Sequence, residues 1–157
     1  MDDSIRIKAH HFVDIVRDCG AGARTFEPHP YGHLVHVVAE RVAADPDVLL
    51  VMELGADAIC EPCVHNIGGL CDDTIDTSNR PKAPTSKREY NLLIDERWCE
   101  RLELKEGDRL TARQFCRRLI DLPGDFSAIY PEEPGDDTAA RERDVRTGAA
   151  QLLRQPS

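Results

Sequence analysis

The alternation of apolar and polar residues along this chain predicts where its strands and helices lie. Ile5-Arg6-Ile7-Lys8-Ala9 alternates apolar and polar side chains, as a strand with one buried face does. Residues 48–54, Val-Leu-Leu-Val-Met-Glu-Leu, form an almost continuous apolar run, which predicts a buried strand. We therefore expect residues 5–9 and 48–54 to pair in one short sheet.

Four other segments carry apolar residues three and four positions apart, the spacing that places them on one face of a helix. Thr85 or Ser86 is suited to cap the third of these helices and Thr111 to cap the fourth, because a hydroxyl accepts hydrogen bonds from free amides of the first turn. The expected helices cover residues 10–18, 31–44, 86–102 and 112–121. This order predicts a small α+β domain whose helices cover one face of the sheet.

The last part of the chain has a different composition. From Pro131 the sequence is acidic and then rich in arginine. We predict a metal-binding or iron–sulfur-binding domain over residues 1–130, followed by a solvent-exposed tail over residues 131–157 with one helix over residues 138–154.

Composition and charge narrow the possible partners. The chain has 157 residues, of which 41% are apolar and 31% charged, and a net charge of −9. Such a charge repels phosphate backbones, so a nucleic-acid partner is not expected. No apolar run approaches the roughly 20 residues that cross a bilayer, and the acidic start lacks the features of a secretory signal. We therefore expect a cytoplasmic protein without a membrane partner, in a compartment where thiols stay reduced.

Three cysteines close together carry the strongest chemical signal. Cys60 and Cys63 have the Cys-x-x-Cys spacing of a metal chelate, and Cys71 follows eight residues later. Gly68-Gly69 lies between them and allows the backbone to fold back, so that a third sulfur reaches the same centre. The segment from Asp57 to Ser86 is too long for an ordinary loop, and a metal centre would organise it. These three thiols predict a zinc ion or an iron–sulfur cluster.

The fourth ligand of such a centre is not fixed by spacing. Asp14, the His10-His11 pair and His65 are candidates, and His65 is equally suited to donate a hydrogen bond to a sulfur ligand. Cys19 is the best further thiol because it follows the first helix. Cys99 and Cys116 lie beside apolar residues of their helices and are expected to be small core residues. His33 and His36 share a helix face, but no third ligand accompanies them, so a structural role is expected.

Three stretches of the chain resemble a known family. They run from Arg6 to Asp14, from Ile59 to Cys71 and from Leu104 to Asp108. These stretches resemble small bacterial and archaeal proteins of unknown function that are labelled iron–sulfur-binding. That family shows an Arg-x-His-His-Leu-Leu-Cys motif after its first strand, then Ile-Cys-x-x-Cys-Pro with a third cysteine, then a Gly-Asp turn. The resemblance covers roughly residues 5 to 121, and its cysteine block is the specific part.

The resemblance implies a cluster ligand near the start of the first helix. Where the family carries its first cysteine, this chain carries Asp14. The resemblance therefore implies a [4Fe–4S] cluster held by Cys60, Cys63 and Cys71, with Asp14 as an exchangeable fourth ligand. A carboxylate is a harder ligand than a thiolate and is displaced from iron more easily. The competing interpretation is that Asp14 is an ordinary helix residue that pairs with Lys8 or Arg17.

Three functions are consistent with these features. The first is an iron–sulfur protein that transfers electrons to a redox partner protein or binds a small molecule at a labile iron. The second is an interaction module stabilised by zinc, without redox chemistry. The third is an enzyme that uses an open iron with His10 or His11 as its acid–base group. The sequence does not name a substrate.

Overall fold

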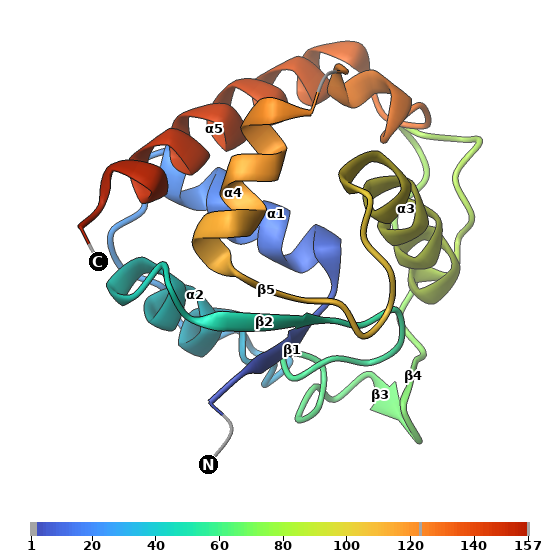
Figure 1. Ribbon diagram of the computed structural model, residues 1–157. Coiled ribbons are helices and arrows are strands. Elements are labelled where there is room, and N and C mark those ends of the chain that lie inside the picture. Colours follow the sequence, from blue (N-terminus) through green and yellow to red (C-terminus); the bar gives the residue numbers. More distant parts are fainter. Residues whose placement is uncertain (1–2, 123, 157) are drawn as a thin grey trace.

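A small sheet joins segments from the beginning, the middle and the later part of the chain. The computed structural model describes residues 3–122 and 124–156. Its strands are β1 (Ile5–Ile7), β2 (Leu49–Met52), β3 (Asn66–Ile67), β4 (Leu70–Cys71) and β5 (Arg109–Thr111). Its helices are α1 (Ala9–Gly20), α2 (Val35–Ala44), α3 (Lys87–Leu102), α4 (Ala112–Asp121) and α5 (Gly135–Arg154), with a short 3-10 helix over Phe126–Ala128. The expected single α+β domain is confirmed (Figure 1).

The main sheet has the strand order β1-β2-β5. β1 runs parallel to β2 with Ile5 opposite Leu50, and β5 runs antiparallel with Leu110 opposite Leu50. The predicted pairing of the two apolar segments is therefore confirmed. Alternate residues are buried, so the central strand is fully buried on one face only, contrary to the expectation from its continuous apolar run. Figure 1 shows α1 and α4 on one side of the sheet.

Helices α1 and α5 cross with their backbones in direct contact. A side chain at Gly148 would overlap the carbonyl of Val16, and one at Gly20 would overlap the carbonyl of Asp144. Small residues are the only ones that allow two helices to approach this closely. Phe12, Val13 and Val16 of α1 are buried in the same core as Val145, Ala149 and Leu152 of α5.

The final helix corrects the expectation of an exposed tail. In the described part of residues 131–157, α5 packs lengthwise on α1 and also touches α4. The expected helix exists and begins three residues earlier than predicted, at Gly135. Its buried face includes Gly148 and Ala149. Such small residues do not produce the pattern of large apolar residues that marks a buried helix face, so the sequence suggested a solvated segment. The chain therefore has no separate tail over these residues.

The predicted caps of α3 and α4 are confirmed, whereas α2 begins later than predicted. Ser86 caps α3 and Thr111 caps α4, the latter in a reciprocal pair with Gln114. Helix α2 begins at Val35, four residues after the expected Tyr31, because Gly32 has a positive φ of 77° and interrupts the chain there. The strand β5 and the β3–β4 hairpin were not predicted. None of the helices in the described residues is long and apolar enough to cross a membrane.

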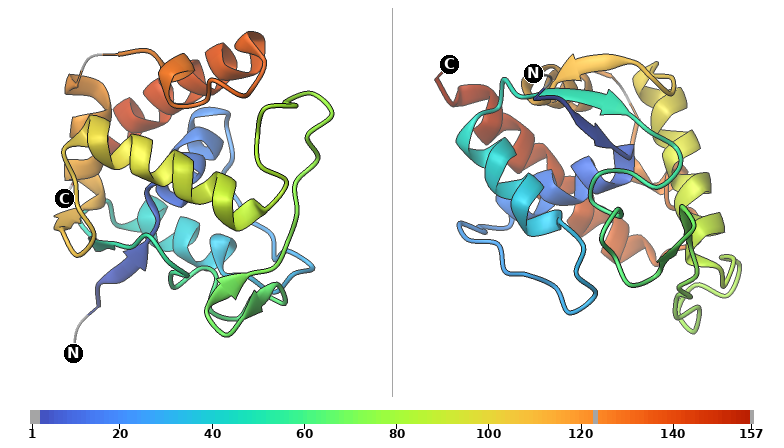
Figure 2. Two further views of the ribbon diagram at one scale, coloured as in Figure 1. Left: turned by 90° about the vertical axis from the view of Figure 1, so that its right-hand side faces the viewer. Right: turned by 90° about the horizontal axis from the view of Figure 1, so that it is seen from below.

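The loop of residues 72–86 stands out from the body of the molecule between the hairpin and α3 (Figure 2, left). It is attached at both ends. Thr74 forms a β-bridge with Ser86, and Lys87 pairs with Asp73 at 3.3 Å. Further along, Arg80 lies over the ring of Tyr90 and pairs with Glu133 at 3.8 Å. These contacts hold residues 72–86 in place, a role that the sequence led us to expect of a metal centre.

Candidate metal centre

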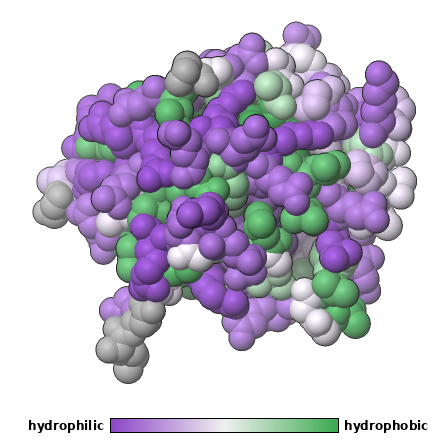
Figure 3. Space-filling view, turned by 45° about the vertical axis from the view of Figure 1, so that its right-hand side comes forward, coloured by the Kyte–Doolittle hydropathy of each residue, from purple (hydrophilic) through white to green (hydrophobic). Residues whose placement is uncertain are grey.

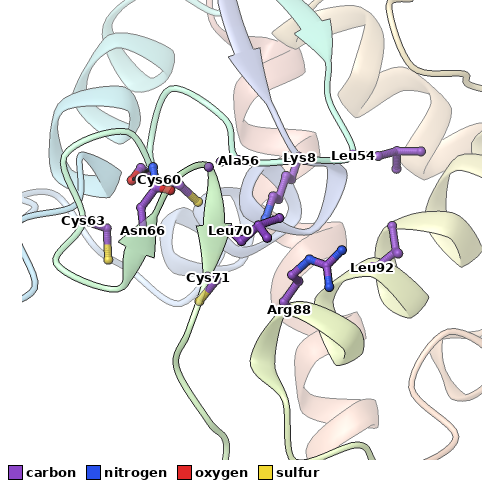
Figure 4. Close-up of a pocket in the computed structure, with 12 residues that line it drawn as sticks. Lys8, Leu54, Ala56, Cys60, Cys63, Asn66, Leu70, Cys71, Arg88 and Leu92 are labelled. Atoms are coloured by element: carbon purple, nitrogen blue, oxygen red, sulfur yellow. Dashed lines mark hydrogen bonds between the residues drawn. The ribbon is translucent and has the colours of Figure 1, made fainter.

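The three predicted cysteines line a single pocket. Cys60, Cys63 and Cys71 form one side of it, and residues that follow β1 and β2, together with residues of α3, form the other (Figure 4). The pocket has a volume of about 140 Å³. The structure therefore brings together, in space, the cysteines that the sequence grouped by spacing.

Two tight turns arrange these cysteines. The amide of Cys63 donates to the carbonyl of Cys60 at 2.9 Å, which closes the Cys-x-x-Cys turn. Gly68 and Gly69 both have positive φ, 62° and 88°, a conformation that favours glycine. They form the turn of the β3–β4 hairpin, which sets Cys71 opposite Asn66. The expectation that this glycine pair folds the backbone back is confirmed.

A buried carboxylate connects the cysteine loop to the first helix. Asp57 Oδ2 accepts hydrogen bonds from the amide of Lys8 at 2.7 Å and from Nδ1 of His11 at 2.7 Å. Its Oδ1 accepts from the amide of Cys60 at 3.1 Å. Asp57 is 1% exposed. Both of its oxygens are therefore occupied, and the residue positions its neighbours instead of offering a free ligand atom.

The electrostatics of this connection favour a charged Asp57 and a protonated Cys60. Burial by itself would raise the pKa of Asp57, but the positive charge and hydrogen bond of His11, with the two amides, outweigh it and hold that pKa well below its usual range. Burial, reinforced by Asp57, raises the pKa of the Cys60 thiol to about 12. A metal would have to displace that proton, so metal binding here is coupled to pH.

His11 lies beside Cys60. A nitrogen of His11, an oxygen of Asp57 and the sulfur of Cys60 lie within 4.8 Å of one another, and no other such trio occurs in residues 3–122 and 124–156. Since Nδ1 of His11 is bonded to Asp57, Nε2 is the nitrogen left for a metal. A carboxylate behind the imidazole is the usual arrangement around metal-binding histidines, because it orients the ring and increases its basicity. Of the sequence candidates for the fourth ligand, His11 is the one that joins a cysteine in such a trio within the described residues.

His10 faces away from this group and into the core. Its backbone amide and its Nδ1 both lie 2.8 Å from Asp95 Oδ1 on α3. Burial lowers the pKa of His10, but Asp95 more than compensates, and the net effect raises that pKa above its ordinary value. His10 therefore connects α1 to α3 through Asp95. Because its side chain is buried, it is poorly placed for the catalytic role that the sequence suggested.

Asp14 does not join the cysteines. Its carboxylate pairs with Arg141 of α5 at 3.3 Å and with Arg17 at 3.9 Å. Arg141 also lies 4.1 Å from the centre of the Tyr130 ring and pairs with Glu133 at 3.0 Å. Asp14 thus belongs to the contact between α1 and α5, and it is not among the described residues that line the cysteine pocket. The structure supports the competing interpretation of an ordinary helix residue.

The remaining candidates are also occupied elsewhere. His65 Nδ1 bonds Asp72 at 2.8 Å across the hairpin, and the ring packs against Tyr31. Cys19 is buried at the end of α1, near Leu152 of α5. Cys99 and Cys116 are buried in the core, as expected for small apolar residues. His33 stacks on His29 at 4.5 Å, and no metal-binding trio forms around it in the described residues.

The other side of the pocket carries positive charge that the sequence analysis did not single out. Lys8 reaches the pocket from the end of β1, and Arg88 and Leu92 reach it from α3 (Figure 4). Lys8 follows a strand of alternating residues, so its pattern suggested an ordinary surface position. The buried connection of its backbone to Asp57, 49 residues away, could not be read from the sequence.

The hairpin that carries Cys71 is apolar on its outer surface. Val64, Ile67 and Leu70 are each more than half exposed. Figure 3 shows apolar side chains at the lower right of the molecule, where the hairpin lies. Leu70 also lines the pocket, so a molecule bound there would cover apolar surface that is otherwise in water.

Comparison with protein-family models, with curated proteins and with solved structures finds no match to this chain. The fold and the site together define a small α+β domain with a cysteine-lined pocket. The resemblance to the labelled iron–sulfur-binding family remains a prediction from the sequence motifs.

Proposed function

We propose that this protein binds a [4Fe–4S] cluster through Cys60, Cys63 and Cys71 and leaves the fourth iron open to a small molecule. The observation that carries the proposal is the placement of these three cysteines around one pocket. A cubane usually has one protein ligand for each iron, so three cysteines leave one iron without a thiolate. Such a cluster supplies an electron-rich centre with one exchangeable coordination position.

The spread of the sulfur atoms supports a cluster over a single ion. A tetrahedral zinc ion with bonds of about 2.3 Å holds its sulfurs about 3.8 Å apart. In the described residues, the three cysteine sulfurs do not all lie within 4.8 Å of one another. A cubane holds its thiolates at the corners of a wider tetrahedron, because four irons lie between them. At least one pair of these sulfurs is therefore farther apart than a single zinc ion would hold them, which favours a larger centre.

The charge of the pocket supports the same proposal. A cluster with three thiolate ligands carries net negative charge, and a buried anion requires a compensating cation. Lys8 and Arg88 line the pocket across from the cysteines. His11 lies beside Cys60 but does not line the pocket, so it positions Cys60 through Asp57 and leaves the fourth iron open.

A pocket with apolar walls favours ligand binding over simple electron transfer. Leu54 and Leu92 line it opposite the cysteines. An electron-transfer site needs only a short path to the surface, whereas a concave space with apolar walls and a few polar groups is typical of a binding site for small molecules. We therefore place binding at the open iron first and electron transfer second.

A single zinc ion is the second candidate, because a nitrogen of His11 and the sulfur of Cys60 lie within 4.8 Å of each other, with Asp57 hydrogen-bonded to the imidazole. Metal and sulfide analysis after anaerobic purification decides between the two. The cluster predicts iron and inorganic sulfide in equal amounts, a brown colour and charge-transfer absorption in the visible range. Stoichiometric zinc without sulfide, in a colourless protein, would overturn the cluster proposal, since the filled d shell of zinc gives no such absorption.

A further inference from the structure

Lys8 is a buried cation without an anionic partner. The residue is 6% exposed, and its side chain lines the cysteine pocket. Within the described part of the chain, its ammonium has no hydrogen bond or ion pair. Burying a charge without a partner is costly, and a protein with a net charge of −9 has many carboxylates that might have been placed there. This position is therefore unfavourable for stability, which indicates that Lys8 faces an anion from outside the chain.

Arg88 provides a second cation in the same pocket. It lies in the first turn of α3, where the helix dipole disfavours positive charge. Its guanidinium has no ion pair in the described residues either. Leu92 lies one turn further along α3 on the same face, and both side chains line the pocket (Figure 4). The helix thus presents a positive group and an apolar group side by side.

The size and the walls of the pocket limit the ligand. Leu54, Leu70 and Leu92 supply apolar surface around the two cations. The volume is about 140 Å³, and an apolar protein cavity of about 150 Å³ is known to accept benzene. A ligand with one anionic group and a hydrocarbon part of four to six carbons matches both features. An inorganic anion would pair with the two cations but would not cover the apolar surface of the leucines.

We propose that this pocket binds a small organic acid, with the carboxylate between Lys8 and Arg88 and the hydrocarbon against Leu54 and Leu92. The inference deepens the proposed function and rests on it in one respect, because it names the ligand class that would reach the open iron. The binding itself depends on side chains that are present with or without a metal.

Isothermal titration calorimetry with isovalerate tests the proposal, on the metal-free and the metal-loaded full chain. We expect saturable binding of isovalerate to the metal-free form, and weaker binding to the metal-loaded form, because a cluster would occupy part of the same pocket and share its two cations. Isovaleramide has the same shape without the charge, and inorganic phosphate has charge without the hydrocarbon. Both should bind at least tenfold more weakly, because a hydrogen bond to a charged group is lost in one case and the apolar contact in the other. Equal affinities for all three probes, or no binding of isovalerate to either form, would overturn the proposal.

Two variants assign the binding to the two cations. Lys8→Met keeps the apolar stem of the side chain and removes the charge, and Arg88→Gln changes an exposed residue that the fold does not require. Each should weaken isovalerate binding about tenfold or more. Arg117→Gln is the matched control, because Arg117 is an exposed arginine on α4 outside the pocket. Unchanged affinity in Arg88→Gln would contradict the proposal even if Lys8→Met failed to fold.

The outcomes separate this inference from the proposed function. A protein that assembles iron and sulfide but does not bind isovalerate retains the cluster proposal and loses the ligand class. A protein that binds isovalerate through Lys8 and Arg88 but contains zinc retains the ligand class and loses the cluster proposal.

Discussion

His11 Nδ1 lies 2.7 Å from the carboxylate of Asp57, which is 46 positions further along the chain. The same carboxylate holds the amides of Lys8 and Cys60. One buried side chain therefore fixes the end of β1, the first turn of α1 and the start of the cysteine loop with respect to one another. It also leaves Nε2 of His11 as the ring nitrogen that is not bonded to this carboxylate.

Asp57→Asn should destabilise the protein even without metal. The amide keeps the shape of the side chain but removes the charge that His11 faces, and its nitrogen cannot accept the hydrogen bonds that a carboxylate oxygen accepted. We expect a loss of about 2–4 kcal/mol in the free energy of unfolding, measured by urea titration of the metal-free protein. Asp72→Asn, at an exposed carboxylate on the hairpin, should cost less than about 1 kcal/mol. Equal effects of the two variants would refute the central role of Asp57.

His11 and Asp14 give opposite predictions for metal content. His11→Ala should lower the amount of iron retained after anaerobic gel filtration, because it removes the nitrogen beside Cys60. Asp14→Asn should leave the iron content unchanged and cost about 1 kcal/mol of stability through its lost pair with Arg141. Loss of iron in Asp14→Asn with retention in His11→Ala would restore the ligand set implied by the sequence motif.

Thiol reactivity should separate the six cysteines. Burial raises the pKa of Cys99 to about 11 and that of Cys116 to about 12, so neither should react with iodoacetamide at pH 8 in the folded protein. Cys63 and Cys71 are partly exposed and should be alkylated first when the metal is absent. Metal loading should protect them, as read by peptide mass spectrometry. Alkylation of Cys63 and Cys71 at the same rate with and without metal would contradict the proposed centre.

The crossing of α1 and α5 should not tolerate a methyl group. Gly148→Ala gains about 0.5–1 kcal/mol of helix propensity, but the new methyl overlaps the carbonyl of Val16. We expect a net loss of about 2 kcal/mol or more in the free energy of unfolding, because packed helices cannot move apart without cost. Gly135→Ala, in the first turn of the same helix with open space around it, is the control and should be neutral or slightly stabilising. A more stable Gly148→Ala variant would disprove the close contact.

The pair of His10 and Asp95 should make stability depend on pH. Because the pKa of His10 is raised in the folded state, its contribution is fully present below the unfolded pKa of about 6.5 and is lost as pH rises through the folded pKa. The free energy of unfolding of the metal-free protein should therefore fall more steeply above pH 6.5 than that of His10→Gln. Parallel pH profiles of the two proteins would show that His10 is neutral in the fold.

The sequence predicted those elements whose signal is local. Ser86 and Thr111 cap the helices that they were expected to cap, because capping depends only on residues within one turn. The pairing of β1 with β2 followed from two apolar segments that each needed a partner. The cysteine pocket followed from spacing and from the glycine turn. Apart from the strand pairing, each of these conclusions uses residues that lie close together in the chain.

The features that were missed depend on contacts between distant residues. The bond between His11 and Asp57 joins two segments whose sequences give no sign of each other. Asp14 matched a family motif by position, but the direction of its side chain depends on Arg141, 127 residues away. Helix α5 was expected to be solvated because its contact with α1 is made by small residues. A close contact between two helix backbones requires small residues, and small residues do not raise the hydropathy of the segment.

The contact between α1 and α5 has a consequence for synthesis. The ribosome synthesises α1 early and α5 late. The apolar face of α1 therefore remains without its main packing partner until almost the whole domain has been made. Such long-range contacts slow folding, because a large loop has to close before they form. The cysteine loop is complete well before that moment. A nascent chain of this protein therefore presents its thiols while its core is still open.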